Sequence, residues 1–336
     1  SRQQITNYVT NAAGELIEIG YKELTNRAFD SRHNVLMQRV EDYLDSTKAD
    51  LINIQEIRNF SFDSRGNILS QIVETYTANG TFLDRQIIEN EKYNIRGTAG
   101  RSTIMTYDES DNFISAKVII NKTFDLRGRV LTQEITNYTD ESMTTFSEVQ
   151  KITNSGYTKL DYAEHMSIST YTQYGELVDR QEIDNVYDVY GNAIEQTINR
   201  YDENDHLIDH KTITNTYDSL LAQRKGNTTH TTIRRYVSLT ESIDTLIERQ
   251  EISNTLFDDK GNVIEQIIDR YVVETGFEYF ASEEAIKNLD ISSRGDAAQQ
   301  QITSYVVDEN GQLVEIGYKE LVNREFDSRH NVLNQL

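Results

Sequence analysis

The chain has 336 residues, a net charge of −22, and neither proline nor cysteine. The acidic charge argues against nucleic acid and anionic membranes as partners, because phosphate groups attract basic surfaces. The lack of cysteine excludes disulfide bonds, thiol nucleophiles and cysteine-based metal sites. No apolar run approaches the roughly 20 residues of a membrane-spanning helix, so we expect no membrane insertion within this segment.

The absence of proline itself points to a fold. Average usage would place roughly 17 prolines in a chain of this length. Proline removes a hydrogen-bond donor from any strand ladder that it enters. A backbone whose N–H groups belong almost entirely to strand ladders would therefore exclude it.

One phrase recurs along the chain: an aromatic residue and aspartate, a turn with glycine and asparagine, then a strand that contains glutamine. In most units a tyrosine lies fourteen residues after the leading aromatic residue, as Tyr76 does after Phe62. In two copies His33 and His330 replace the glycine. The residues that we expect to form the turns and side-chain ladders are Phe62, Asp63, Gly66, Gln71, Tyr76, Gln133, Tyr138, Tyr187, Asp188, Gly191, Gln196, Tyr201, Phe257, Asp258, Gly261, Gln266 and Tyr271.

A second strand precedes each aromatic residue and ends in the pattern Gln-x-Ile-x-Asn, as in Gln55 to Asn59 and Gln250 to Asn254. Each unit therefore comprises two strands of about ten residues and two turns. The period of about 33 residues is typical of repeat architectures. Helical periodicity is weak, and only Ser282 to Leu289 is a candidate for a short helix.

A longer period is superimposed on the first. Residues Gln3 to Gln38 align with Gln300 to Gln335 at an offset of 297, and 26 of these 36 positions are identical. Nine units of about 33 residues account for that offset. We therefore interpret residues 1–297 as a nine-unit repeat block and residues 298–336 as the start of the next block, in one continuous array without separate domains. The chain looks like a fragment of a giant protein.

These patterns predict an all-β fold. Glycine and asparagine in the turns tolerate positive φ and are typical of hairpins. They favour a continuous antiparallel β-meander of two-strand repeats, wound into a tube or spiral. The alternative is a two-layer β-solenoid, in which equivalent residues of successive units stack directly. In the meander, we expect Gln71 to meet a glutamine of a neighbouring strand.

The aromatic-Asp-x-x-Gly motif resembles the YD (Rhs-type) repeats of bacterial surface and toxin-shell proteins. The best matches begin at Tyr187-Asp188, with Gly191, and at Phe257-Asp258, with Gly261. The resemblance implies a spiral of β-hairpins. This sequence departs from the family, because a second downstream glycine is largely missing and the regions that process and plug the shell have no counterpart. The nested repetition also looks like that of giant tandem-repeat extracellular proteins.

Candidate chemical sites are few. His206 and His210 are four residues apart, a spacing that suits a metal pair on a helix, but the local pattern is that of a strand. The turns at Asp202, Asn204, Asp205 and Asp308 gather oxygen ligands, so Ca²⁺ is the one cofactor that we consider. The tripeptide Arg294-Gly295-Asp296 falls at a turn of the repeat, and we interpret it as variation of that turn. The sequence leaves glycosylation open.

No catalytic motif is present, and we expect that the protein is not an enzyme; an unrepeated polar cluster inside a pocket would be needed to reverse that expectation. We expect a structural protein that forms an extracellular or cell-surface fibre, tube or sheath. Its partner would be itself, through further copies of the block in the same or neighbouring chains. The alternatives are an adhesin stalk that presents a terminal binding domain and a YD-type shell that encloses a toxin.

Overall fold

The computed structural model describes residues 1–10, 15–292, 295–326 and 332–336. The chain divides into two compact units. Unit 1 comprises Ser1–Asn154 and Thr170–Glu176, and unit 2 comprises Ser155–Ser169 and Leu177–Leu336. Among the described residues, no helix is long and apolar enough to cross a bilayer.

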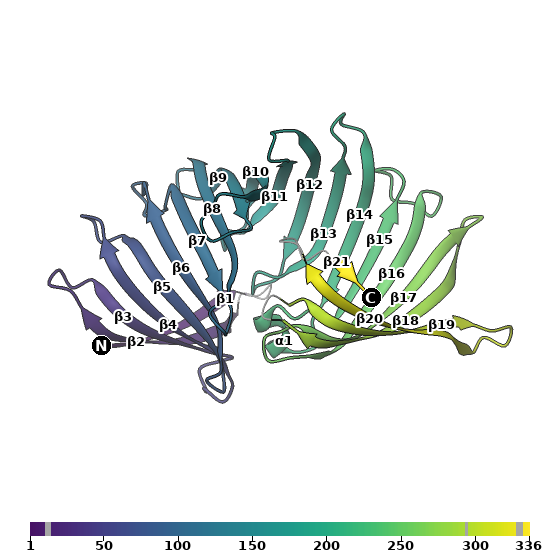
Figure 1. Ribbon diagram of the computed structural model, residues 1–336, viewed down its shortest axis with the longest axis horizontal. Helices are drawn as coiled ribbons and strands as arrows, with labels where there is room; N and C mark the ends of the chain where they lie inside the picture. Colours follow the sequence, from purple (N-terminus) through teal and green to yellow (C-terminus); the bar gives the residue numbers. More distant parts are fainter. Residues whose placement is uncertain (11–14, 293–294, 327–331) are drawn as a thin grey trace. The chain divides into compact units, whose positions relative to one another are not determined.

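Both units are built from strands (Figure 1). The strands of unit 1 are β1 (Arg2–Thr10), β2 (Leu16–Phe29), β3 (Val35–Tyr43), β4 (Leu51–Phe62), β5 (Ile68–Thr77), β6 (Phe82–Glu91), β7 (Arg101–Tyr107), β8 (Phe113–Phe124), β9 (Val130–Tyr138) and most of β10 (Phe146–Tyr157). Strand β11 (Ala163–Tyr171) has residues in both units. The strands of unit 2 are β12 (Leu177–Tyr187), β13 (Ala193–Tyr201), β14 (Leu207–Thr216), β15 (His230–Tyr236), β16 (Leu246–Phe257), β17 (Val263–Glu274), β18 (Phe277–Ile291), β19 (Ala297–Val307), β20 (Leu313–Phe326) and β21 (Val332–Gln335).

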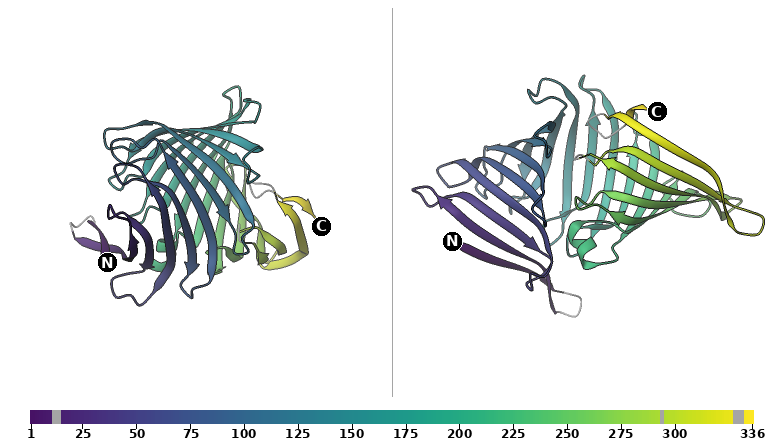
Figure 2. Two further views of the ribbon diagram at one scale, coloured as in Figure 1. Left: turned by 60° about the vertical axis from the view of Figure 1, so that its left-hand side comes forward. Right: turned by 60° about the horizontal axis from the view of Figure 1, so that its bottom comes forward.

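Within each unit, consecutive strands pair with one another. In unit 1 the antiparallel pairing runs from β1 to β10. In unit 2 it runs from β12 to β21. Figure 2 shows the strands of each unit side by side in a twisted, curved sheet. The predicted all-β meander is confirmed. A stacked solenoid would have required parallel pairing between successive repeats of about 33 residues, and every described pairing is antiparallel.

The centre of each hairpin explains why these segments pair in this register. The isoleucine of Gln-x-Ile-x-Asn lies directly opposite a β-branched residue of the following strand. The pairs are Ile57–Val73, Ile88–Ile104, Ile119–Ile135, Ile183–Ile198, Ile213–Ile233, Ile252–Ile268 and Ile286–Ile302. Such cross-strand pairs each contribute about 0.2–1 kcal/mol, and a one-residue slip would turn them to the opposite face.

The sheets are only partly covered. In unit 1 the buried hydrophobic side chains include Tyr21, Ile54, Tyr107, Val118 and Ile152, while most strand residues are half-buried. Stability must therefore come largely from contacts between neighbouring strands and turns rather than from one thick core.

Two local features differ from the sequence-based expectation. The helix considered at Ser282–Leu289 is wrong, because those residues lie within β18 and pair with β17 and β19. The one helix in the described chain is α1 (Leu220–Lys225). Its N-cap, Ser219, accepts a hydrogen bond from the Ala222 N–H, and Gly226 ends it in the left-handed conformation. This helix replaces a short turn between β14 and β15.

Candidate assembly surface

The residues that recur most regularly in the repeat lie in the turns that join each Gln-x-Ile-x-Asn strand to the next strand. In the turn of Asp63, Oδ1 accepts the N–H groups of Arg65 and Asn67 at 2.8 and 2.9 Å. Oδ2 accepts Nδ2 of Asn67 at 2.8 Å. The Asn67 side chain and these N–H groups hold the pKa of Asp63 below its usual value. The aspartate and asparagine of the motif thus satisfy the turn from within.

The glycine of the turn has two tasks. Gly66 has φ +85°, a left-handed conformation that side-chain-bearing residues rarely adopt. A Cβ atom at this position would lie 3.0 Å from Oδ1 of Asn34, which belongs to the preceding turn of the same kind. His33, at φ 68°, shows that a histidine can supply the conformation where it replaces glycine; His330 lies outside the described residues.

This contact between turns recurs in both units. Gly97 lies against Asn67, Gly128 against Arg96, Gly191 against Tyr162, and Gly261 against Asn227. Hydrogen bonds join the same turns: Arg65 donates to the carbonyls of Asn94 and Tyr93 at 2.9 and 3.1 Å, and Thr98 donates to the carbonyl of Gly128 at 2.9 Å. We call the turns 30–34, 63–67, 94–98 and 125–129 of unit 1, and 158–162, 188–192 and 258–262 of unit 2, the stacked rim.

The turns at the opposite ends of the strands behave differently. We call turns 45–50, 77–81, 108–112 and 172–176 of unit 1, and 202–206 and 308–312 of unit 2, the open rim. A Cβ atom at Gly80, Gly175 or Gly311 would meet no atom within 4 Å, although all three glycines have positive φ. These turns satisfy their own backbone and do not pack on one another at the glycine.

The calcium candidates lie on the open rim. Asp202 Oδ1 accepts the N–H groups of Asn204 and His206, both at 2.8 Å. Asp308 Oδ1 accepts those of Asn310 and Gln312. The Asp205 carboxylate pairs with Arg180. Among the described residues no group of three or more histidine or carboxylate side chains has an arrangement that could hold a metal ion; His206 is paired with Asp202, and His210 lies on β14 with its Nδ1 2.5 Å from Oδ1 of Asn199.

A row of asparagines ties three strands together. Asn59, Asn154 and Asn323 are almost fully buried. Their Nδ2 groups donate to the carbonyls of Val35, Val130 and Ala297 on the preceding strand. In five hairpins that have both the asparagine and the motif glutamine, the asparagine Oδ1 accepts a hydrogen bond from the glutamine Nε2 of the following strand. These Gln–Asn bonds are Gln38–Asn26, Gln196–Asn185, Gln266–Asn254, Gln300–Asn288 and Gln335–Asn323, at 2.7, 2.8, 3.3, 2.9 and 2.8 Å.

The partner of the motif glutamine was therefore predicted incorrectly. Gln71 and Gln133 lie opposite Asn59 and Asn121, not opposite another glutamine. In these two hairpins the asparagine Oδ1 is buried and has no hydrogen-bond partner. The recurrence of asparagine two residues after isoleucine indicated that this asparagine has a structural role. The carbonyl group that it binds could not be predicted, because that depends on where each strand ladder ends.

The repeated tyrosines lie at the open-rim ends of the strands. Rings of Tyr76, Tyr138 and Tyr271 pack against Phe82, Phe146 and Phe280, with centroids 5.4, 6.2 and 5.5 Å apart. Cations of neighbouring strands lie over several of them, as Arg180 does over Tyr201 at 4.4 Å. Aromatic pairs and cation–π contacts each stabilise by about 0.5–1.5 kcal/mol, so these tyrosines are well placed to hold strand ends together.

The leading aromatic residues lie at the stacked rim. The Tyr187 hydroxyl donates to the carbonyl of Ala163 at 3.0 Å, and its ring packs on Tyr162. Burial raises the pKa of Tyr187. In the Arg-Gly-Asp tripeptide, Arg294 lies outside the described residues, Gly295 has φ +86°, and Asp296 is only 7% exposed. That burial fits a residue of a turn.

The chain was compared with known proteins. No family model and no curated protein matches it. Among solved structures it is similar to part of the crystal structure of TcdB2-TccC3-Cdc42, with 13% sequence identity and a TM-score of 0.14. The alignment covers 99% of this chain and 22% of the other, so the chain spans less than a quarter of that protein's length. We base no functional argument on a likeness of this size.

Proposed function

We propose that the chain is a structural protein, part of an extracellular or cell-surface fibre, tube or sheath that grows by repetition of hairpins. One observation carries this proposal: within unit 1 and within unit 2, turns of the stacked rim fit the preceding turn through a glycine that leaves room for the neighbour's side chain, as Gly66, Gly97 and Gly191 do. A hairpin of this design therefore presents a surface that another copy of itself can cover.

Such arrays are quasi-one-dimensional, because each repeat contacts only its neighbours. Their strength comes from the sum of many similar interfaces. The asparagine row, the central isoleucine pairs and the stacked rim give each interface hydrogen bonds, apolar contact and a fixed register. The partner in this proposal is a further copy of the block, in the same chain or a neighbouring one, and neither a cofactor nor catalysis is part of it.

Electron cryomicroscopy of the protein isolated from its native source tests the proposal. We expect filaments, tubes or sheets with helical or lattice order and an axial spacing that corresponds to the strand length. Discrete closed particles without axial order would overturn the proposal and would favour a shell that encloses another molecule.

A further inference from the structure

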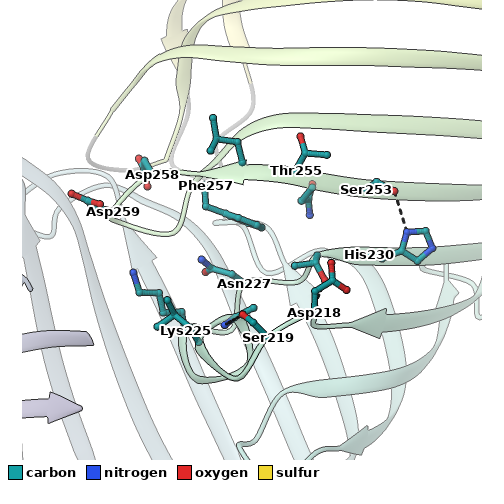
Figure 3. A pocket seen from close by; sticks show the side chains of 15 residues that line it. Asp218, Ser219, Lys225, Asn227, His230, Ser253, Thr255, Phe257, Asp258 and Asp259 are labelled. Carbon is teal, nitrogen blue, oxygen red and sulfur yellow. Dashed lines mark hydrogen bonds between the residues drawn. The ribbon is translucent and has the colours of Figure 1, made fainter. Parts of the chain in front are cut away.

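One place in unit 2 interrupts the repeat. Helix α1 replaces the short stacked-rim turn between β14 and β15, and an open hollow of about 740 Å³ lies between it and the end of β16 (Figure 3). Lys225 and Asp218 line one side, and Phe257 extends over the hollow from β16. Insertions that break a repeat are often binding sites, and the volume is that of a small-molecule pocket.

Three side chains from β15 and β16 form a connected set, and two of them line this hollow. His230 lies opposite Ser253, and its Nδ1 is 3.2 Å from Ser253 Oγ. Its Nε2 is 2.7 Å from Oε2 of Glu251. His230 and Ser253 both line the hollow, and the hydrogen bond between them is drawn in Figure 3.

Glu251 determines which nitrogen of the His230 imidazole carries the proton. Its carboxylate accepts from Thr232 Oγ1 at 2.8 Å and pairs with Arg249. Although burial opposes ionisation, Thr232, Arg249 and His230 together lower the pKa of Glu251. An ionised Glu251 accepts only, so the neutral imidazole carries its proton on Nε2. The lone pair of Nδ1 then faces the Ser253 hydroxyl, which is the arrangement of a nucleophile beside its general base.

A regular part of the same unit provides a matched contrast. His165 occupies the position equivalent to His230, Glu182 that of Glu251, and Asp184 that of Ser253. Ser167 donates to Glu182, and Arg180 pairs with it, as Thr232 and Arg249 do with Glu251. His165 Nδ1, however, lies 2.5 Å from the Asp184 carboxylate. The same arrangement of histidine, glutamate and arginine thus occurs twice in unit 2, whereas the hydroxyl and the adjoining hollow occur together at Ser253.

We propose that Ser253 is a nucleophile for small esters, with His230 as its general base and Glu251 as the positioning residue. Ser253 Oγ attacks the ester carbonyl carbon while its proton moves to His230 Nδ1. The carbon–oxygen bond to the alcohol then breaks, and the alcohol leaves with that proton. Water next attacks the acyl-serine and gives a proton to Nδ1, and return of that proton releases the carboxylic acid and free Ser253. The sum is ester and water to acid and alcohol.

The structure also sets the scale of this activity. The N–H of Asn254, the residue after the nucleophile, is already donated to the Thr229 carbonyl at 2.8 Å. It therefore does not stabilise an oxyanion in the way that the equivalent group does in efficient serine hydrolases. General-base assistance alone raises a reaction rate about 10²–10⁴-fold. We expect the rate of ester hydrolysis to exceed the uncatalysed rate by this factor.

The test uses the whole chain with p-nitrophenyl acetate, followed by absorbance and by mass spectrometry of the quenched protein. We expect acetyl on Ser253 and at least a tenfold loss of rate in Ser253→Ala, with a melting temperature unchanged. The matched His165→Ala variant should keep the full rate. Acetylation at other residues with an undiminished rate in Ser253→Ala would overturn the proposal.

Two further variants separate the parts of the site. Glu251→Gln removes the carboxylate beside the imidazole, so we expect a slower rate and a rate–pH profile moved to lower pH; an unmoved profile contradicts the positioning role. Asp184→Ser rebuilds the serine–histidine–glutamate set away from the hollow beside α1 and should gain less than a tenth of the Ser253-dependent rate. An equal rate there would overturn the role of the hollow. None of these outcomes bears on filament formation, which the imaging experiment decides separately.

Discussion

Turns on the two rims make the same internal hydrogen bonds, but only turns on the stacked rim pack on one another at the glycine. On the stacked rim, the hydrogen bond from the Asn67 N–H to Asp63 is partly buried, and on the open rim the equivalent bond from Asn112 to Asp108 is exposed. Gly66 and Gly80 have nearly the same φ, at +85° and +82°, but only Gly66 has a neighbouring turn within van der Waals distance. The motif therefore fixes the shape of a turn on both rims and builds an interface on one.

The lengths of the connections vary at both ends of the strands. Turns on the open rim do not pack on one another at Gly80, Gly175 or Gly311. Connections at these strand ends range from 108–112 in unit 1 to 237–245 in unit 2, and the strands that they join still pair. Within each unit, turns on the stacked rim contact the preceding turn at the glycine, as Gly66 and Gly191 do. The connection is longer at 92–100 and at α1, and a hollow adjoins α1. Variation of a stacked turn changes its neighbour's surroundings as well as its own.

The largest expected effect comes from adding one methyl group on each rim of unit 1. Gly128→Ala would place Cβ 2.7 Å from Cβ of Arg96, whereas Gly80→Ala would meet nothing within 4 Å. Both variants lose about 1 kcal/mol because φ is positive, and Gly128→Ala should lose a further ~1–3 kcal/mol from overpacking. Urea denaturation followed by circular dichroism measures both; equal losses would remove the distinction between the rims.

Acid should affect the two rims alike. Hydrogen bonds from Asn67 lower the pKa of Asp63, and those from Thr47 lower the pKa of Asp45 on the open rim. A carboxyl whose pKa is lower in the folded state stabilises above its unfolded value of about 3.9, and this stabilisation is lost as pH falls through the folded pKa. We therefore expect the melting temperature to fall between about pH 4 and pH 2.

Asp63→Asn and Asp45→Asn provide the check on this pH dependence. Each should flatten the acid slope by a similar amount, because each carboxylate holds only its own turn. Melting curves recorded from pH 7 to pH 2 give the slopes. A flattening confined to Asp63→Asn would mean that stacking, not the turn itself, sets the carboxylate's affinity for protons.

The smallest expected effect is at the bridge between two stacked turns. Arg65 donates one N–H to each of two carbonyls, of Asn94 and Tyr93, from an exposed position. Arg65→Ala should lower the melting temperature of unit 1 by about 1–2 °C. Arg65→Lys should recover less than half of that loss, since an ammonium cannot reproduce the guanidinium fork; full recovery would assign the effect to charge alone.

Much of this fold could be predicted from sequence, because the same pattern recurs about every 33 residues along the chain. The alternation around Gln71 and Ile57, together with Gly66 in the turn, indicated strands and hairpins. Two things could not be deduced. The bond from Asn59 to the Val35 carbonyl depends on the register at which a ladder ends. The strand Phe277–Ile291 lacks the usual alternation at Ser282–Leu289 and is held by its two neighbours instead, which is tertiary context overriding local preference.

The candidate sites follow the same division. Turn aspartates such as Asp63 and Asp188 were recognisable because their spacing to asparagine is fixed. The set of His230, Glu251 and Ser253 was not, because its members lie on two strands, with the histidine 21 and 23 residues from its two partners in sequence. Only the pairing of β15 with β16 brings them together.

Hydrogen exchange of the turn amides tests the central claim most directly. The N–H groups of Asn67 and Asn112 make equivalent bonds, at 2.9 and 2.8 Å, to Asp63 and Asp108 within unit 1. If the stacked rim is an interface, the Asn67 amide should exchange at least tenfold more slowly than the Asn112 amide under native conditions. Equal exchange rates would contradict the account, because the two rims would then differ in appearance and not in stability.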